Sequence, residues 1–243
     1  FLKIFDDKVN SRSLHKIPVR RIGGLAIFFT ISVFSYLYEI SYISIFVLPL
    51  SILFIVSLLD DAYNISAIPR LVIHLLAALI FINSLPINEN FFISSFLIFS
   101  ILAAINSFNF MDGANGLVGG ASVIVFLLYA ILSYYFADIN LMFFNLIVAF
   151  SIFGFLFLNF DNAKIFLGDC GSIIIGFLSI SIGIIGWNKN FWPIWTPFIL
   201  ILPFLADTGV ILLERIFKGQ KFWLAHKNHY YQRLIIDGWS HRK

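Results

Sequence analysis

Adjacent carboxylates mark the first candidate site in the chain. Asp60 and Asp61 follow the apolar pair Leu58-Leu59, so they stand at the end of a predicted helix, where the helix dipole disfavours negative charge. Two neighbouring carboxylates also repel each other. Such a pair becomes favourable when it binds a cation, and carboxylate oxygens, phosphate oxygens and water are the ligands that Mg²⁺ takes. The plainer interpretation is a solvated helix end.

Amides and a third carboxylate recur at the end of another apolar run. On a helix, Asn106, Asn109 and Asp112 are each about 60° apart, so they share one broad face. Buried amides and carboxylates are costly in hydrocarbon unless they have partners, and this face is therefore expected to border the protein interior or a wet cavity. Gly113 and Gly116 then end the helix and let backbone approach a ligand. A ladder of amide bonds between helices is the alternative.

A glycine-containing stretch, Phe166 to Ser172, precedes a further apolar run. Ser172 is expected to cap the helix that follows, and the free N–H groups of a helix start bind anions. Gly168 permits a tight backbone there. Asp169 beside an anion site is explained if a divalent metal bridges its carboxylate to a phosphate. Phe166 is a candidate for stacking on a base or simply a lipid-facing ring, and a plain turn with an N-cap is the alternative for the whole stretch.

Two histidines and an arginine lie in the last part of the chain. If this segment is helical, His226, His229 and Arg233 line one face that presents imidazoles and a guanidinium, which suits a diphosphate. Zinc is a weaker interpretation because no third ligand is near, and a basic helix on the membrane surface is another. Asp207, inside an apolar run, is either a site residue or the partner of a polar group on a neighbouring helix.

Composition predicts that a membrane protein holds these motifs. Of the 243 residues, 60% are hydrophobic and 12% are charged, and the mean hydropathy is +0.94, whereas soluble domains are about a quarter charged. A helix of about 20 apolar residues crosses the hydrocarbon core. The single cysteine excludes an internal disulfide. We predict an all-α, polytopic transmembrane helical bundle in one domain, 1–243, with about eight spans at 23–40, 43–59, 69–85, 91–108, 116–136, 140–158, 172–187 and 194–216.

Lys and Arg are distributed unevenly between the loops that join these spans. Of the 16, only Lys189 lies in the short loops that follow the first, third, fifth and seventh spans. Cytoplasmic loops are enriched in Lys and Arg. The long polar loops, and with them the four motifs, are therefore predicted to lie at the cytoplasmic face.

In this order and on one face, the motifs resemble those of the polyprenyl-phosphate N-acetylhexosamine-1-phosphate transferase family, the MraY/WecA/TagO group. The resemblance covers the chain from about residue 6 to its last residue. Asn115 stands where many relatives have Asp. The final segment is most similar to the branch that initiates O-antigen or capsule synthesis. The stretches that carry the resemblance are Asn10–Gly24, Asp60-Asp61 with Arg70, Asn106–Gly116, Phe166–Ser172, His226–Leu234 and Gly238–Arg242.

The resemblance implies a Mg-dependent phospho-N-acetylhexosamine transferase of the bacterial inner membrane. It would transfer N-acetylhexosamine-1-phosphate from a UDP-sugar to undecaprenyl phosphate and release UMP. Mg²⁺, or Mn²⁺, would be held by Asp169 with help from Asp112, while Asp60 and Asp61 hold or deprotonate the lipid phosphate. Catalytic contacts are also expected from His226 and His229. The residues expected to bind substrate are Asn106, Asn109, Asn115, Phe166, Gly168, Ser172, Arg70 and Arg233.

The expected partners are a UDP-N-acetylhexosamine, a polyprenyl phosphate lipid and the membrane, with no nucleic acid; a homodimer is left open. The family implies ten or eleven spans, so this chain, which begins at Phe1, is expected to be a fragment that lacks spans at both ends. A transporter or channel is the competing class, and it predicts charges at both mouths and through the membrane depth. A lipid-phosphate enzyme with a CDP-linked donor would carry an Asp-Gly-x-x-Ala-Arg motif, which the sequence does not contain.

Overall fold

The structure, a computed structural model, describes residues 5–7, 19–87, 91–160, 163–220 and 229–239. Ten helices and three short strands lie within these ranges. In chain order they are β1 (Asp6–Asp7), β2 (Val19–Arg21), α1 (Gly23–Leu37), α2 (Ile43–Tyr63), α3 (Ala67–Asn83), α4 (Phe91–Met111), α5 (Leu117–Tyr135), α6 (Ile139–Asn159), β3 (Ile165–Phe166), α7 (Gly168–Asn188), α8 (Thr196–Leu200), α9 (Leu202–Phe217) and α10 (Tyr230–Ile236).

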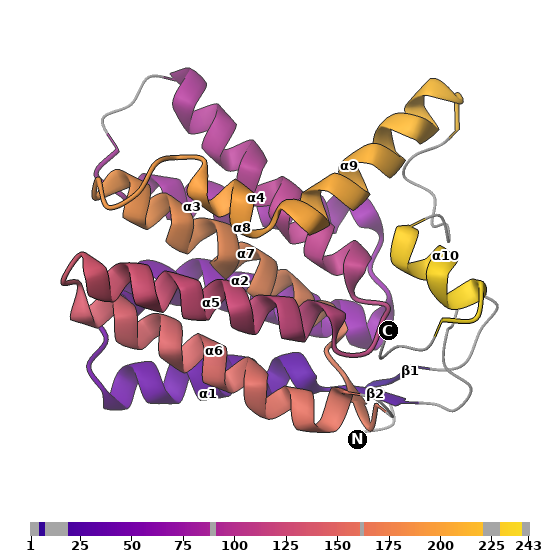
Figure 1. The fold of residues 1–243 in the computed structure, drawn as a ribbon, viewed down its shortest axis with the longest axis horizontal. Helices are drawn as coiled ribbons and strands as arrows, with labels where there is room; N and C mark the ends of the chain where they lie inside the picture. The colour runs from indigo at the N-terminus through magenta and orange to yellow at the C-terminus, as the bar shows by residue number, and fades with distance from the viewer. Residues whose placement is uncertain (1–4, 8–18, 88–90, 161–162, 221–228, 240–243) are drawn as a thin grey trace.

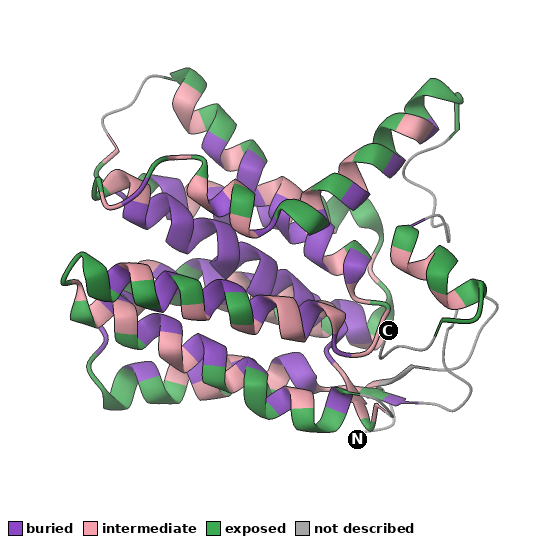
Figure 2. Cartoon of the chain, in the orientation of Figure 1, coloured by how far each residue is buried: buried purple, intermediate pink, exposed green. Residues whose placement is uncertain are grey.

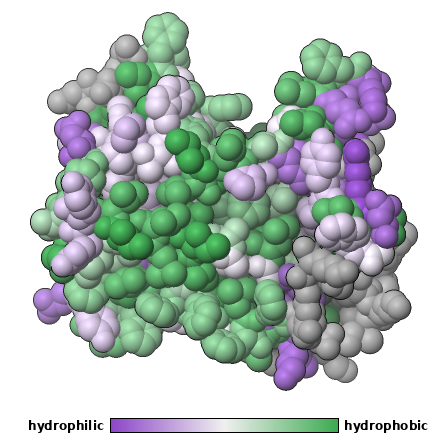
Figure 3. Space-filling view, viewed as in Figure 1, coloured by the Kyte–Doolittle hydropathy of each residue, from purple (hydrophilic) through white to green (hydrophobic). Residues whose placement is uncertain are grey.

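The first seven apolar runs of the sequence all form helices, α1 to α7. Five of them, α2, α4, α5, α6 and α7, are long and apolar enough to cross a membrane, while α1 and α3 are shorter apolar helices. The prediction of a helical, multi-pass membrane protein is confirmed. Apolar side chains also cover the middle of the molecular surface, and hydrophilic residues gather toward its two ends (Figure 3).

The eighth predicted span is not one continuous helix. The run 194–216 is divided into α8 and α9, which meet at Ile201. Pro203 lies in the first turn of α9. Because proline has no N–H and its ring crowds the preceding turn, it ends one helix and begins another. The prediction of an uninterrupted span at 194–216 is therefore wrong.

Three very short strands also depart from the all-α prediction. They form a sheet in the order β1-β2-β3, in which β2 is antiparallel to β1 and parallel to β3. Segments of two or three residues are too short to show the alternating hydropathy by which strands are recognised. The sheet joins the start of the chain to the segment that leads into α7, at the end of the bundle that also carries α10 (Figure 1).

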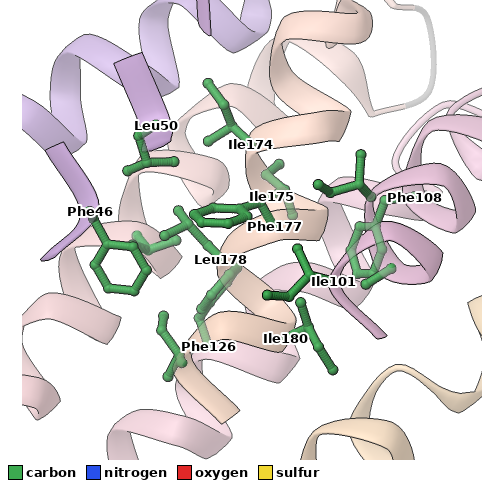
Figure 4. Close-up of a cluster of buried hydrophobic side chains, with 14 of the residues drawn as sticks. Phe46, Leu50, Ile101, Phe108, Phe126, Ile174, Ile175, Phe177, Leu178 and Ile180 are labelled. Atoms are coloured by element: carbon green, nitrogen blue, oxygen red, sulfur yellow. The ribbon is translucent and has the colours of Figure 1, made fainter. Parts of the chain in front are cut away.

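Helix α7 is the centre of the fold. Eighteen of its 21 residues are buried, and it contacts α1, α2, α4, α5 and α8 (Figure 2). A helix that is apolar on all sides is stable only when other helices surround it. Figure 4 shows its side chains Ile174, Phe177 and Leu178 among Phe46 and Leu50 of α2, Ile101 and Phe108 of α4 and Phe126 of α5.

Loops at the opposite end of the bundle are joined by one carboxylate. Asp138, which caps α6, accepts hydrogen bonds from the Tyr42 hydroxyl (2.5 Å), Lys189 Nζ (2.9 Å) and the backbone N–H of Leu141 (2.9 Å). Partial burial opposes ionisation, but the bond from Tyr42 and the others outweigh it and lower the pKa of Asp138. Lys189, the one Lys or Arg of the short loops, therefore has a structural partner in Asp138.

Replacing Asp138 with Ala is expected to destabilise the protein by about 2 kcal/mol, because a helix cap is lost and Tyr42 is left without its acceptor. Thermal unfolding in detergent measures the change. Because the folded-state pKa is lowered, this stabilisation is present above the unfolded pKa of about 4 and is lost as the pH falls through the folded value. Glu39→Gln, an exposed change at the same end, is the control; equal melting temperatures for both variants would contradict the prediction.

Candidate active site

Asp61 forms the N-terminal cap of α7. Its Oδ1 accepts a hydrogen bond from the backbone N–H of Asp169, and its Oδ2 accepts one from Cys170, both at 3.0 Å. Gly168 has a φ of +75°, and a Cβ there would lie 2.7 Å from Asp61 Oδ2. Glycine thus gives both the backbone turn and the room for the carboxylate. The anion predicted at the start of this helix is a side chain of the protein itself.

Ser172 does not cap the helix, contrary to the prediction. Because Asp61 satisfies the first N–H groups, α7 begins four residues earlier, at Gly168. Ser172 then lies inside the first turns, where its hydroxyl donates to the carbonyl of Gly168 at 3.1 Å. It also accepts a hydrogen bond from Asn109 Nδ2 at 3.2 Å. The residue remains at the site, with a different role.

Strand β2 places the positively charged side chain of Arg21 near Asp61. Arg21 Nη1 lies 3.9 Å from Asp61 Oδ1, and the carboxylate is fully buried. Arg20, the neighbour of Arg21, is exposed on the strand. Alternation along a strand sends adjacent side chains to opposite faces. The sheet therefore selects Arg21, and not Arg20, for the buried carboxylate.

Arg70 joins the other two carboxylates of the cluster. Its Nη1 lies 2.5 Å from Asp60 Oδ2 and 3.0 Å from Asp169 Oδ2. Asp60 Oδ1 accepts a further bond from the backbone N–H of Ile65 at 2.6 Å. One guanidinium nitrogen thus holds oxygens from α2 and α7 together. The positive charge of Arg70 offsets the repulsion between the two converging carboxylates.

Of the two asparagines on the amide face of α4, one contacts the carboxylate cluster. Asn109 Nδ2 donates to Asp169 Oδ1 at 3.0 Å. Asn106 Nδ2 instead donates to the carbonyl of Leu102 on its own helix at 2.7 Å. An amide one turn farther into the bundle satisfies itself on the backbone when no charged partner is within reach. The structure therefore brings Asn109, but not Asn106, to the carboxylates.

Asp112 follows the end of α4 and belongs to the same electrostatic cluster. Burial raises its pKa well above the usual range, and the nearby charges of Asp169 and Asp61 raise it further, against the opposing charge of Arg21. A fourth carboxylate in such a cluster holds its proton until more positive charge arrives. Asn115, in the turn that follows, is partly buried.

Asn159, which no sequence motif marks, fixes the two glycine-containing segments to each other. Its Oδ1 accepts from the backbone N–H of Gly116 at 2.7 Å, and its Nδ2 donates to the carbonyl of Ile165 at 3.0 Å. Phe166, partly buried, follows on β3. A single asparagine at the end of an apolar run carries no pattern, so only its position in the fold reveals the role.

The final segment reaches the site through His229, whose neighbour His226 lies outside the described residues. His229 is buried, and its Nδ1 lies 3.4 Å from Asp207 Oδ1 on α9, which also accepts from the backbone N–H of Tyr230 at 3.2 Å. Burial lowers the pKa of His229, and the charge of Asp207 acts in the opposite direction. Asp207 is therefore a helix partner for the last segment.

The same segment covers the turn between α4 and α5. The His229 ring stacks near that of Phe110, with centroids 5.9 Å apart, and the Tyr231 hydroxyl donates to the Phe110 carbonyl at 3.1 Å. A Cβ at Gly113 would collide with the Tyr231 side chain. Gly113 thus gives the segment room to pack.

Arg233 lies beside Glu214 and Tyr230 rather than beside Asp60 and Asp169. Its Nη2 lies 3.6 Å from Glu214 Oε2, and its guanidinium lies over the Tyr230 ring. Helix α10 begins only at Tyr230, so His229 precedes the helix. His229 is the N-cap of α10, and its side chain and that of Arg233 contact different partners, Asp207 and Glu214.

Replacing Asp207 with Asn is expected to lower activity about tenfold, because the buried His229 loses the carboxylate that orients it. Turnover by the purified protein in detergent, together with its melting temperature, measures this. Thr208→Val is a control on the next residue, which is partly buried. Wild-type turnover in Asp207→Asn would show that the contact with His229 is not used.

The carboxylates suit a hard cation that is shared with a phosphate. Within the described ranges, no group of three or more His, Cys, Asp or Glu side chains is arranged to hold a metal ion alone. Mg²⁺ commonly takes one or two protein carboxylates and completes its shell with phosphate oxygens and water. The Oδ2 atoms of Asp60 and Asp169, which converge on Arg70, fit that share of the ligands.

Comparison with known proteins gives one family and a consistent set of relatives. Residues 42–187 match glycosyl transferase family 4. A Bacillus subtilis protein described as a probable undecaprenyl-phosphate N-acetylglucosaminyl 1-phosphate transferase is 29% identical over 255 residues, which is 97% of this chain and 71% of that protein. The undecaprenyl-phosphate alpha-N-acetylglucosaminyl 1-phosphate transferases of Escherichia coli O157:H7 and Yersinia pestis are 26% and 27% identical, over 98% of this chain and 71% of each relative.

Proposed function

This chain belongs to glycosyl transferase family 4, and we propose that it transfers an N-acetylhexosamine-1-phosphate from a UDP-sugar to undecaprenyl phosphate and releases UMP. The relatives carry the acceptor and the reaction in their names, and they match nearly the whole chain. The product would begin a lipid-linked surface glycan. The crowding of carboxylates at one polar end, rather than through the membrane depth, disfavours a transporter.

The observation that carries the proposal is the position of Arg70 between two carboxylates. Asp60 and Asp169 come from different helices, and one guanidinium nitrogen lies within hydrogen-bond distance of both. A divalent cation on these carboxylates would leave the guanidinium available to pair with a phosphate of the substrate. Phosphoryl transfer depends mainly on such positioning and charge neutralisation.

In the proposed reaction, an oxygen of the lipid phosphate forms a bond to the β-phosphorus of the UDP-sugar. The bond from that phosphorus to the UMP oxygen breaks, and UMP leaves with the electron pair. The acceptor has a second pKa of about 6, so it is mostly dianionic near neutral pH and needs little help from a base. The main barrier is the approach of two anions. Arg70 and Arg21, the cations nearest the cluster, would lower it by neutralising charge.

Mg²⁺, when bound, would neutralise the diphosphate and align it for attack. Asp169 would hold it, together with Asp112 or Asp60 and the phosphate oxygens. Asn109 keeps the Asp169 carboxylate oriented. Asp61, with both oxygens on the start of α7, would serve as a positioning residue, which leaves Asp60 as the member of the pair that faces the lipid phosphate.

The final segment would close the site over the donor. His229 is anchored on α9 and packs on Phe110 near the end of α4. By the distribution of Lys and Arg, this end of the bundle would face the cytoplasm of a bacterial cell, with the chain in the inner membrane. A soluble donor and a phosphate at headgroup depth then meet at one surface.

The test is UMP release from a panel of UDP-N-acetylhexosamines by the purified protein with undecaprenyl phosphate in detergent. The mass of the lipid product identifies the sugar. We expect release only with both substrates present and Mg²⁺ or Mn²⁺ added, and a loss of more than a hundredfold in excess EDTA. Absence of a lipid diphosphate sugar with every donor would refute the function, and full rate in EDTA would refute the metal.

A further inference from the structure

A buried histidine lies beneath the carboxylate cluster and takes no part in it. His74 of α3 is 5% exposed. Neither of its ring nitrogens has a hydrogen-bond partner among the residues that the structure describes. Buried polar atoms almost always have partners, because an unpaired group costs free energy in an apolar interior. Two such atoms on one side chain therefore point to a site.

The pair formed by Arg70 and Asp60 helps to place His74. Arg70 and Asp60 bond across the hairpin of α2 and α3, which fixes the register of the two helices. One turn farther into the bundle are His74 on α3 and Ser57 on α2. At about 100° per residue, His74 lies in the middle of the buried face of α3, about 40° from Arg70. Ser57 lies between the directions of Asp60 and Asp61, and it is fully buried.

Ser57 is also unpaired, as are Ser35 and Ser181, whereas several other buried helix serines of the described residues bond to their own helix. Ser100, Ser122 and Ser133 each donate to the carbonyl four residues earlier, at 2.6 to 2.7 Å. That bond is the default for a buried serine in a helix. The Ser57 hydroxyl makes no hydrogen bond within the described residues. Two polar side chains at one depth, on neighbouring helices, thus share the same requirement.

We propose that His74 and Ser57 hold an ordered water beneath the carboxylates, and that His74 acts through this water as a positioning residue for Arg70. A buried water makes about three hydrogen bonds. Ser57, one ring nitrogen of His74 and a guanidinium N–H of Arg70 would supply them. The described hydrogen bonds of Arg70 use only Nη1, and a guanidinium has five donors. The water would fix the plane of the guanidinium that joins Asp60 to Asp169.

The inference rests on the proposed function for its kinetic test, which compares His74→Leu with His74→Gln. Glutamine keeps a donor and an acceptor, whereas leucine keeps only volume. We expect His74→Leu to lower kcat about tenfold with KM for the UDP-sugar nearly unchanged, and His74→Gln to stay within about threefold of wild type. Ser57→Ala should lower kcat severalfold, and Ser122→Ala, a serine that bonds to its own helix, should not.

A double-mutant cycle with Arg70→Lys separates positioning from packing. If His74 acts through Arg70, His74→Leu should cost much less in the Arg70→Lys background than in wild type. Equal costs in both backgrounds would overturn the inference, and so would a wild-type kcat in His74→Leu. Neither result would touch the proposed function, which stands as long as the wild-type protein carries out the transfer.

Thermal unfolding in detergent gives a readout that needs no substrate. A histidine unpaired in a dry core is destabilising, so leucine would raise the melting temperature by a few degrees. A histidine that holds a water with Ser57 stabilises, so leucine should lower it by about 2–4 °C. A rise would overturn the inference, and a fall would support it even if the wild-type protein transferred no sugar.

Discussion

Replacing Asp169 with Asn is expected to lower turnover by on the order of a thousandfold, the largest single effect at this site. The Asp169 carboxylate accepts from Arg70 Nη1 and Asn109 Nδ2, both at 3.0 Å. An amide has only one acceptor oxygen, so its NH₂ would face one of these donors. The substitution also removes the negative charge that a divalent cation requires. Initial rates of UMP release measure the loss.

The control for this variant is Asp237→Asn, an exposed carboxylate at the end of α10. Both variants should be produced at wild-type level with similar melting temperatures, because the backbone N–H of residue 169 still donates to Asp61. Turnover within about threefold of wild type in Asp169→Asn would remove this carboxylate from the chemistry. A large loss in Asp237→Asn would instead indicate that the assay responds to charge in general.

Replacing Arg70 with Met is expected to lower turnover more than a hundredfold and to destabilise the fold. Two carboxylate oxygens now share Arg70 Nη1, one of them at 2.5 Å. Without the guanidinium they would repel each other between α2 and α7. Because Arg70 is only partly buried, the cost should stay below the about 3–5 kcal/mol for removing one partner of a fully buried ion pair. Steady-state rates and the melting temperature, both in detergent, measure the two effects.

Arg70→Lys and Lys164→Met complete that experiment. Lysine keeps the charge without the planar fork, so an intermediate loss of about tenfold is expected. Lys164 is an exposed cation in the loop before β3, and its removal should leave the rate unchanged. If Arg70→Met and Lys164→Met behaved alike, the role of Arg70 in holding Asp60 and Asp169 would be refuted.

Sequence patterns predicted the helices of this fold and the membership of the site better than its internal contacts. Apolar runs of about 20 residues are a strong signal, and each of α1 to α7 follows one. The convergence of Asp60, Asp61, Asn109 and Asp169 also followed from their shared membrane face. These properties are local or additive along the chain, so they can be read without knowing which helices touch.

Pairwise roles could not be read in the same way. Asp61 caps a helix that begins more than a hundred residues later, and no local pattern links the two. For the same reason the local sequence predicts Ser172 as the cap, although α7 begins at Gly168. Asn106 and Asn109 are equivalent by spacing. Only the packing of α4 against α7 distinguishes the one that meets a carboxylate.

The central place of α7 has a consequence for how the protein is made. This helix follows α1 to α6 in the chain, yet the earlier helices α1, α2, α4 and α5 all pack around it. They cannot close into their final arrangement while it is still being synthesised, an interval of about 5–20 s between residues 61 and 169 at common rates of translation. The nascent bundle must therefore stay open, with the carboxylates of α2 in contact with water or lipid headgroups. The step that brings the start of α7 to Asp61 therefore also forms the carboxylate cluster, and α8, α9 and α10 follow later in the chain.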